Sequence, residues 1–251
     1  LNEIKKQWSS GKFAVKKSDE DMHTAIENYL TEKYGSAGEK IHTGRSRNDQ
    51  ILVAIRLFLK QELRATLKEI SALQKTLGIF IRQHNNVLMP GYSHQQRGMP
   101  ITVDIWAGAF AESLKDDKTI IKTAAKIIDQ SPLGSGAGFG VPIRINRELT
   151  AKLLKFRRVQ DNPLYCQNSR GKFENIALQA IGNVMLTLNK LATDVLLFTT
   201  KEFNFFLVPE SLTTGSSIMP QKRILDIAQI LRRKTKLFLC CQQQVQSLSI
   251  D

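Results

Sequence analysis

Apolar residues that recur every three or four positions dominate the chain. The first such series begins at Ile51 and ends at Ile81, and between them lie Leu52, Ile55, Leu59, Leu63, Leu67, Ile70, Leu73 and Leu77. This spacing is that of one face of an α-helix. It predicts a single helix of about thirty residues, against a mean helix length of about twelve.

Three later segments show the same period. One follows Pro100, one extends from about Phe173 to Phe198, and the last begins near Arg223. Their apolar positions are, in order, Val103, Trp106, Phe110, Leu114, Ile121, Ala124 and Ile128; Ile181, Met185, Leu188, Ala192 and Val195; and Ile224, Ile227, Leu231 and Phe238. Apolar residues outside each series indicate contacts on more than one side. Because no segment alternates convincingly with a period of two, we predict an all-α fold, a bundle of long helices.

Three connections around these helices are rich in reactive side chains: residues 39–50 (EKIHTGRSRNDQ), 89–100 (MPGYSHQQRGMP) and 213–222 (TTGSSIMPQK). Loops held by a rigid scaffold commonly carry functional groups. Each connection also has a simpler interpretation, since Asn48 or Asp49 can cap the first helix and a lone His94 can be an ordinary hydrogen-bonded residue. The occurrence of all three connections together favours a functional site.

The chain has 251 residues and a formal net charge of +13, from 36 Lys and Arg against 23 Asp and Glu. An excess of positive charge is compatible with nucleic-acid binding. The basic residues are dispersed, however, and no nucleic-acid-binding motif accompanies them. Attraction of small anionic substrates fits the charge equally well, and we expect no nucleic-acid partner.

Other patterns exclude further classes of protein. Cys166, Cys240 and Cys241 have neither disulfide nor metal-site spacing, and the adjacent pair is expected to lie in the core. The glycine-rich segment 131–142 lacks dinucleotide-binding spacing, so we expect a turned loop without a phosphate-binding role. No signal peptide opens the chain, and no apolar run approaches about 18 residues. We expect no cofactor, no metal, no membrane partner and a cytoplasmic location.

The three loops resemble the signature regions of the argininosuccinate lyase family, a member of the fumarase and aspartase superfamily. The matching stretches are HTGRSRNDQ from His42, MPGYSHQQR from Met89 and GSSIMPQK from Gly215, in the family's order. Segments such as EDMH (20–23) and PLGSGAGFG (132–140) extend the resemblance over nearly the whole chain. GSSxMPxK alone indicates the superfamily, whereas GRSRNDQ indicates argininosuccinate lyase.

The resemblance implies a mostly helical homotetramer with a core of twenty helices, in which each active site takes one signature region from each of three subunits. On this basis, residues 1–47 are the remainder of an N-terminal helical domain and residues 48–251 form an incomplete central long-helix domain. The chain begins at Leu1 rather than Met and has no helix-stop signal near Asp251. We therefore expect further residues at both ends, including a C-terminal domain.

The family reaction is the reversible elimination of arginine from argininosuccinate, a small molecule, to give fumarate. The resemblance assigns Ser216 as general base, Lys222 as the cation that stabilises the intermediate and His94 as the acid–base group at the leaving-group side. It assigns substrate binding to Arg47, Asn48, Ser93 and Gln95, and a supporting role to Ser217.

In the segment that follows Lys222, three residues differ from the family pattern. Ile224 replaces an asparagine that helps to hold substrate, Leu225 replaces a proline, and Gln229 replaces a glutamate that pairs with the histidine. An amide can orient an imidazole but cannot stabilise the imidazolium by charge. A non-catalytic structural protein on the same scaffold, like the related lens crystallins, is therefore an alternative. Another superfamily lyase, acting on adenylosuccinate, aspartate or fumarate, is a third hypothesis.

Overall fold

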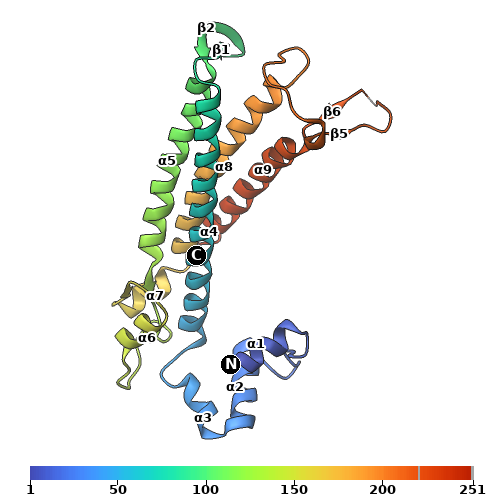
Figure 1. Ribbon diagram of the computed structural model, residues 1–251. Coiled ribbons are helices and arrows are strands. Elements are labelled where there is room, and N and C mark those ends of the chain that lie inside the picture. The colour runs from blue at the N-terminus through green and yellow to red at the C-terminus, as the bar shows by residue number, and fades with distance from the viewer. Residues whose placement is uncertain (220, 250–251) are drawn as a thin grey trace. The chain divides into compact units, whose positions relative to one another are not determined.

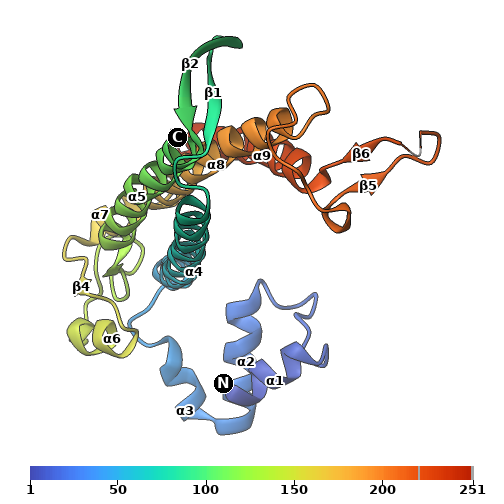
Figure 2. The same cartoon turned by 45° about the horizontal axis from the view of Figure 1, so that its top comes forward.

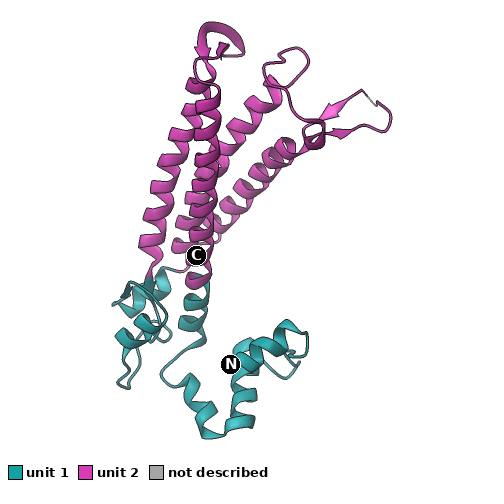
Figure 3. Cartoon of the chain, in the orientation of Figure 1, with its two compact units in different colours: residues 1–55, 130–169 teal, residues 56–129, 170–251 magenta. Residues whose placement is uncertain are grey.

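The computed structural model describes residues 1–219 and 221–249. The chain forms two compact units, the first made of residues 1–55 and 130–169 and the second of residues 56–129 and 170–251 (Figure 3). The predicted domain boundary falls at the first residue of helix α4 (Arg47–Gln83). That division into an N-terminal and a central domain stays a prediction.

The second unit consists mainly of long helices. Helices α4, α5 (Val103–Ile128) and α8 (Lys172–Phe198) run side by side there, and α9 (Asp226–Ser247) packs along α8 (Figures 1 and 2). The first three predicted helices are confirmed, and so is the helical fold class.

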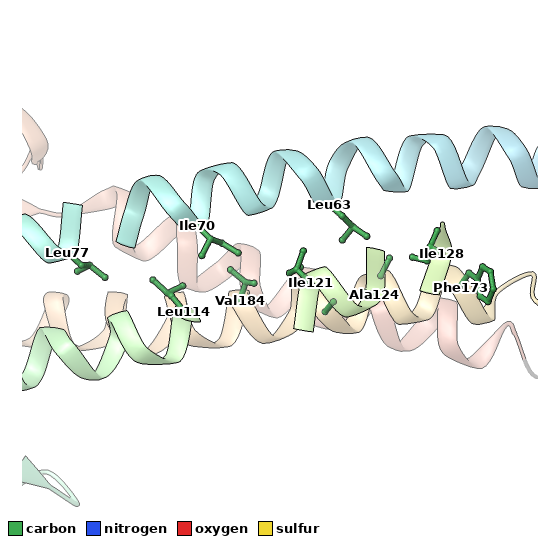
Figure 4. Packing of buried hydrophobic residues seen from close by; sticks show 11 residues of the cluster. Leu63, Ile70, Leu77, Leu114, Ile121, Ala124, Ile128, Phe173 and Val184 are labelled. Carbon is green, nitrogen blue, oxygen red and sulfur yellow. The ribbon is translucent and has the colours of Figure 1, made fainter. Parts of the chain in front are cut away.

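A continuous apolar core joins α4, α5 and α8 in this unit (Figure 4). Its buried members are Leu63, Ile70 and Leu77 of α4; Leu114, Ile121, Ala124 and Ile128 of α5; and Phe173, Ala177, Ala180 and Val184 of α8. All the members from α4 and α5 belong to the apolar series that predicted those helices. Full burial of a leucine-sized side chain stabilises a fold by about 1.5–3 kcal/mol, so these apolar faces hold the unit together.

The fourth helix begins later than predicted. Strand β6 (Arg223–Ile224) pairs antiparallel with β5 (Thr214–Gly215), and α9 starts only at Asp226. Leu225 precedes the helix without a side-chain cap hydrogen bond. The prediction was wrong because two adjacent apolar residues fit the start of a helical face and a short strand equally well.

Short strands also occur where the sequence predicted no sheet. Strands β1 (Leu88–Ser93) and β2 (Gln96–Thr102) form an antiparallel hairpin between α4 and α5. A Cβ at Gly91 would lie 2.6 Å from the carbonyl oxygen of Met99, so this close approach requires glycine. The sequence did not predict the hairpin because prolines and glycines, which weaken a strand pattern, interrupt its alternation.

The first unit contains shorter elements. They are α1 (Asn2–Ser9), α2 (Met22–Tyr34), α3 (Ser36–Glu39), the 3₁₀ helix η1 (Lys40–His42), β3 (Gln130–Ser131), α6 (Arg147–Leu153), β4 (Arg158–Val159) and α7 (Pro163–Asn168). Strands β3 and β4 pair in parallel. A second 3₁₀ helix, η2 (Glu210–Leu212), precedes β5 in the second unit.

Two sequence-based expectations about α8 and α9 need correction. Cys240 and Cys241 are exposed, because α9 buries Ala228 and Thr235 and turns the cysteines away from that face. Helix α8 contains an 18-residue window with a mean hydropathy of 1.2, so by length and composition it is apolar enough to cross a membrane. A core helix passes the same test, and α8 supplies residues to the core described above.

Candidate active site

The segment that carries Arg47 and Asn48 is fixed by hydrogen bonds at the start of α4. The Ser46 hydroxyl accepts the N–H of Asn48 at 3.2 Å, and the Asp49 carboxylate accepts the N–H of Ser46 at 3.0 Å. This reciprocal pair resembles a capping box. Ser46 therefore caps the helix, and the interpretation of Asn48 or Asp49 as the cap residue was wrong.

The guanidinium of Arg47 lies against the start of α2. It forms an ion pair with Glu20, lies 3.7 Å from the Asp21 carboxylate and donates to the Thr24 hydroxyl at 3.1 Å. The Asp21 carboxylate also caps α2 by accepting the N–H groups of His23 and Thr24. The hydrogen bond to Glu20 is the main cause that raises the pKa of Arg47 above its ordinary value. The site thus has a permanent cation whose acidic neighbours the sequence analysis had noted only as part of the EDMH resemblance.

Asp49 is a residue of this region that the sequence analysis did not assign to the site. Its carboxylate is fully buried and accepts the N–H groups of Gly134 and Gly136 at 2.9 and 3.0 Å. The glycine-rich segment therefore folds around a carboxylate of the same unit. The sequence contained a signal for this residue, because Asp49 lies in HTGRSRNDQ and the two glycines lie in PLGSGAGFG, two of the stretches that carry the family resemblance.

Ser93, His94 and Gln95 lie at the tip of the β1–β2 hairpin. Ser93 pairs with Gln96, so His94 and Gln95 are the two turn residues, with φ angles of 51° and 61°. Positive φ at both positions is typical of a type I′ turn, in which residues other than glycine and asparagine are uncommon. All three side chains are exposed. The turn therefore presents a hydroxyl, an imidazole and an amide together.

A cavity of about 720 Å³ lies between this turn, α5, α8 and α9. Trp106 of α5 donates its indole N–H to Asp194 of α8 at 2.9 Å, and both residues line the cavity with Arg232 of α9. The ring of Tyr92 in β1 lies 5.3 Å from that of Phe203. Aromatic pairs of this kind contribute about 0.5–1.5 kcal/mol beyond burial, so this pair stabilises the hairpin next to its turn.

The pairing of β5 with β6 closes the loop 216–222, which carries Ser216, Ser217 and Lys222. The Ser216 hydroxyl accepts the backbone N–H of Met219 at 3.3 Å. A hydrogen-bond donor directed at this oxygen favours negative charge on it. Ser216 is half-buried, whereas Ser217 and Lys222 are exposed. This arrangement suits a hydroxyl that gives up its proton, in a loop that also carries the cation of Lys222.

Two of the residues that depart from the family pattern occupy different settings. Ile224 is half-buried in β6, opposite Thr214. Gln229 is exposed on α9 and lines a hollow of about 450 Å³ together with Leu196, Arg232, Arg233 and Lys236. This hollow contains three cations, and His94 is not among its described lining residues.

The structure brings some of the predicted residues together and leaves others apart. In the second unit, the hairpin and the β5–β6 loop stand at the same end of the bundle but separate from each other in both views (Figures 1 and 2). The described side-chain hydrogen bonds of that loop stay within residues 210–226. His94 and Ser216 therefore do not meet within one chain. Among the described residues, no cluster of three or more His, Cys, Asp or Glu is arranged to hold a metal ion.

The chain matches known proteins in sequence. Residues 1–224 match the family model described as Lyase. The chain belongs to this lyase family. The argininosuccinate lyase of Thermotoga neapolitana is 48% identical to this chain over 232 residues, which cover 92% of the chain and 58% of that relative. The chain thus spans little more than half the length of this relative. Gln229 lies beyond the residues that the family model matches.

Solved structures share the lyase fold. A crystal structure of EDDS lyase in complex with formate superposes with a TM-score of 0.86 at 24% identity, covering 95% of this chain and 46% of that one. A class II fumarase from Schistosoma mansoni gives a TM-score of 0.72 at 18% identity, covering 87% and 52% of the two chains. These likenesses confirm the predicted fold, a bundle of long helices.

Proposed function

We propose that this chain is the central part of an argininosuccinate lyase, which eliminates arginine from argininosuccinate to give fumarate. The observation that carries the proposal is the 48% identity to an argininosuccinate lyase over 92% of the chain. The GRSRNDQ stretch, at residues 44–50, supports the same substrate, since it indicates argininosuccinate lyase rather than the wider superfamily.

The geometry of the loops supports this chemistry. The reaction removes a proton from a carbon next to a carboxylate, and the dianionic intermediate needs cations and N–H donors directed at it. Ser216 acts as the base, since the N–H of Met219 already donates to its oxygen, and Lys222 adds positive charge in the same loop. Arg47 binds a substrate carboxylate by the bidentate geometry that a guanidinium offers.

The hairpin supplies the other half of the reaction. His94 handles the proton on the leaving-group side, directly or through water. Ser93 and Gln95 bind substrate from the same turn, and Asn48 binds it beside Arg47. Because the type I′ turn displays three polar side chains together, one small substrate can contact all of them.

We further propose that each site is assembled from three subunits of a homotetramer in the cytoplasm. Within one chain the hairpin and the β5–β6 loop stand apart (Figure 1), so a site that needs both takes them from different copies. The long helices also expose apolar side chains that an assembly with a twenty-helix core would bury. These include Phe58, Ile105, Ile120, Ile127, Leu186, Leu197, Ile230 and Leu237.

A non-catalytic structural protein on the same fold is a second candidate. Gln229 cannot supply the charge that a glutamate gives to an imidazolium, and β6 holds the apolar Ile224 next to the loop that carries Ser216. Loss of an acid–base partner lowers a rate by about 10²–10⁴. The first candidate therefore predicts a slow but measurable enzyme, whereas the second predicts no turnover.

Fumarate release from argininosuccinate by the full-length protein, followed by ultraviolet absorbance, tests the proposal. We expect turnover that Ser216→Ala abolishes and that the matched control Ser217→Ala largely retains. No fumarate at high enzyme concentration would contradict the lyase function. If the triple substitution of Ile224→Asn, Leu225→Pro and Gln229→Glu then created activity, the structural protein would be supported. Parallel assays with adenylosuccinate and aspartate test the other superfamily activities.

A further inference from the structure

The Asp49 carboxylate is surrounded by backbone donors from two segments that are distant in sequence. One carboxylate oxygen accepts the N–H of Ser46 at 3.0 Å, and the other accepts the N–H groups of Gly134 and Gly136 at 2.9 and 3.0 Å. The side chain is 0% exposed. None of the roles proposed above uses this residue.

Burial of a carboxylate is unfavourable unless hydrogen bonds replace its water. Burial raises the pKa of Asp49 above its ordinary value, and the N–H donors of Gly136, Ser46 and Gly134 oppose that shift. A hydrogen bond to a charged group is stronger than one between neutral groups. Loss of the acceptor would leave buried N–H groups without a partner, so the carboxylate and the two segments depend on one another.

The glycine-rich segment is shaped to surround this carboxylate. Gly134 and Gly136 have φ angles of 85° and 60°, which residues with a Cβ rarely adopt. A Cβ at Gly134 would lie 2.5 Å from Cδ1 of Ile145, and one at Gly136 would lie 2.8 Å from the carbonyl oxygen of Gly140. Backbone N–H groups that converge in this way form an anion-binding concavity. The anion bound here is a side chain of the same unit.

We propose that Asp49 is a positioning residue for substrate binding, because its carboxylate links the glycine-rich segment 131–142 to the Ser46 cap that sets the direction of Arg47 and Asn48. This inference rests on the proposed function. Arg47 and Asn48 directly precede Asp49 in the first turn of α4. A displacement of about 1 Å in a positioned group can cost about 10²-fold in catalytic efficiency, and for a group that binds substrate the loss is expected in KM.

The substitution Asp49→Asn in the full-length protein tests the role with almost unchanged side-chain volume. The amide nitrogen replaces an acceptor with a donor and faces N–H groups. We expect the KM for argininosuccinate to rise by about tenfold or more, while kcat changes less, because Ser216 and His94 lie on other elements. We also expect faster amide hydrogen exchange in residues 131–142, measured by mass spectrometry.

Asp117→Asn is the matched control. Asp117 is also a buried aspartate, at 5% exposure, but it accepts the Thr187 hydroxyl at 2.8 Å inside the helical unit and holds no loop. We expect its KM and the exchange in residues 131–142 to match the wild type. Gly134→Ala changes the other partner of the same hydrogen bond and should also raise KM. In the double variant, the KM increase should be smaller than the two single effects combined, because both substitutions disturb one contact.

The outcomes separate this inference from the proposed function. An unchanged KM in folded Asp49→Asn protein, or an equal KM increase in Asp117→Asn, would overturn the positioning role. If the wild-type protein releases no fumarate, the proposed function fails and the exchange measurement decides about Asp49. In that case, unaltered exchange in residues 131–142 contradicts the link, and faster exchange supports it.

Discussion

The indole N–H of Trp106 and the carboxylate of Asp194 form a hydrogen bond of 2.9 Å that joins α5 to α8. Both residues line the cavity beneath the turn that carries His94. Helices α5 and α8, which share the apolar core, are therefore also joined by a hydrogen bond near the hairpin.

Substitution Trp106→Phe should lower the free energy of unfolding by about 1–3 kcal/mol, because it leaves the half-buried Asp194 carboxylate without this donor. Urea denaturation measures the change. Trp8→Phe is the matched control, because Trp8 lies in α1 with 54% of its surface exposed, and its effect should stay within about 0.5 kcal/mol. Equal losses for the two variants would show that the hydrogen bond is not the cause.

Asp117 should make stability depend on pH. Burial raises its pKa above the ordinary value near 3.8, the Thr187 hydroxyl opposes the shift, and repulsion from Asp116 adds to it. When the pKa of a group is higher in the folded protein than in the unfolded chain, the group stabilises the fold at a pH below the unfolded-state pKa. This contribution is lost as the pH rises through the folded-state pKa. Asp117→Asn should therefore gain stability relative to the wild type as the pH rises, over a series that starts at about pH 4.

Urea denaturation across that pH series measures the gain for Asp117→Asn. The exposed neighbour Asp116 provides the control, since Asp116→Asn should show no comparable gain. A stability difference between Asp117→Asn and wild type that shrinks with rising pH would contradict the assigned direction.

Gln229→Glu should stabilise α9. The new carboxylate would stand three and four residues before Arg232 and Arg233, and such pairs stabilise a helix by about 0.2–0.5 kcal/mol each. The melting temperature should rise at low ionic strength, and the gain should fall at high salt. Gln243→Glu, on the same helix but without a cation at these spacings, should give no gain. Equal shifts for both variants would exclude the arginine pairs as the cause.

Leu63→Ala should lower the free energy of unfolding by about 2–5 kcal/mol, because it opens a cavity between α4 and α5. Leu63 is 0% exposed in the apolar core (Figure 4). Leu153→Ala, at a position that is 70% exposed, makes the same chemical change and should have an effect within about 0.5 kcal/mol. A small loss at Leu63 would contradict the assignment of the core.

The long helices could be predicted because the core imposes its period on the sequence. Leu114, Ile121 and Ile128 recur at intervals of seven and are all fully buried, so the pattern and the packing carry the same information. The strand that contains Ile224 and the β1–β2 hairpin were not predicted. Strands of two to seven residues are too short to show a pattern that identifies them. Cys240 and Cys241 were wrongly assigned to the core, because apolar composition does not state which face a helix buries.

The sequence by itself determined the helical class, the three polar loops and the residues that define the family, because these depend on local order along the chain. Only the tertiary structure decided which of those groups meet. Gly134 donates to a carboxylate 85 positions earlier, and Arg47 contacts Thr24, 23 positions earlier. His94, in the β1–β2 turn, and Ser216, in the loop after β5, belong to separate elements of the same unit, although the proposed chemistry needs both. Such relationships arise from chain folding over long separations, and a pattern of neighbouring residues contains no record of them.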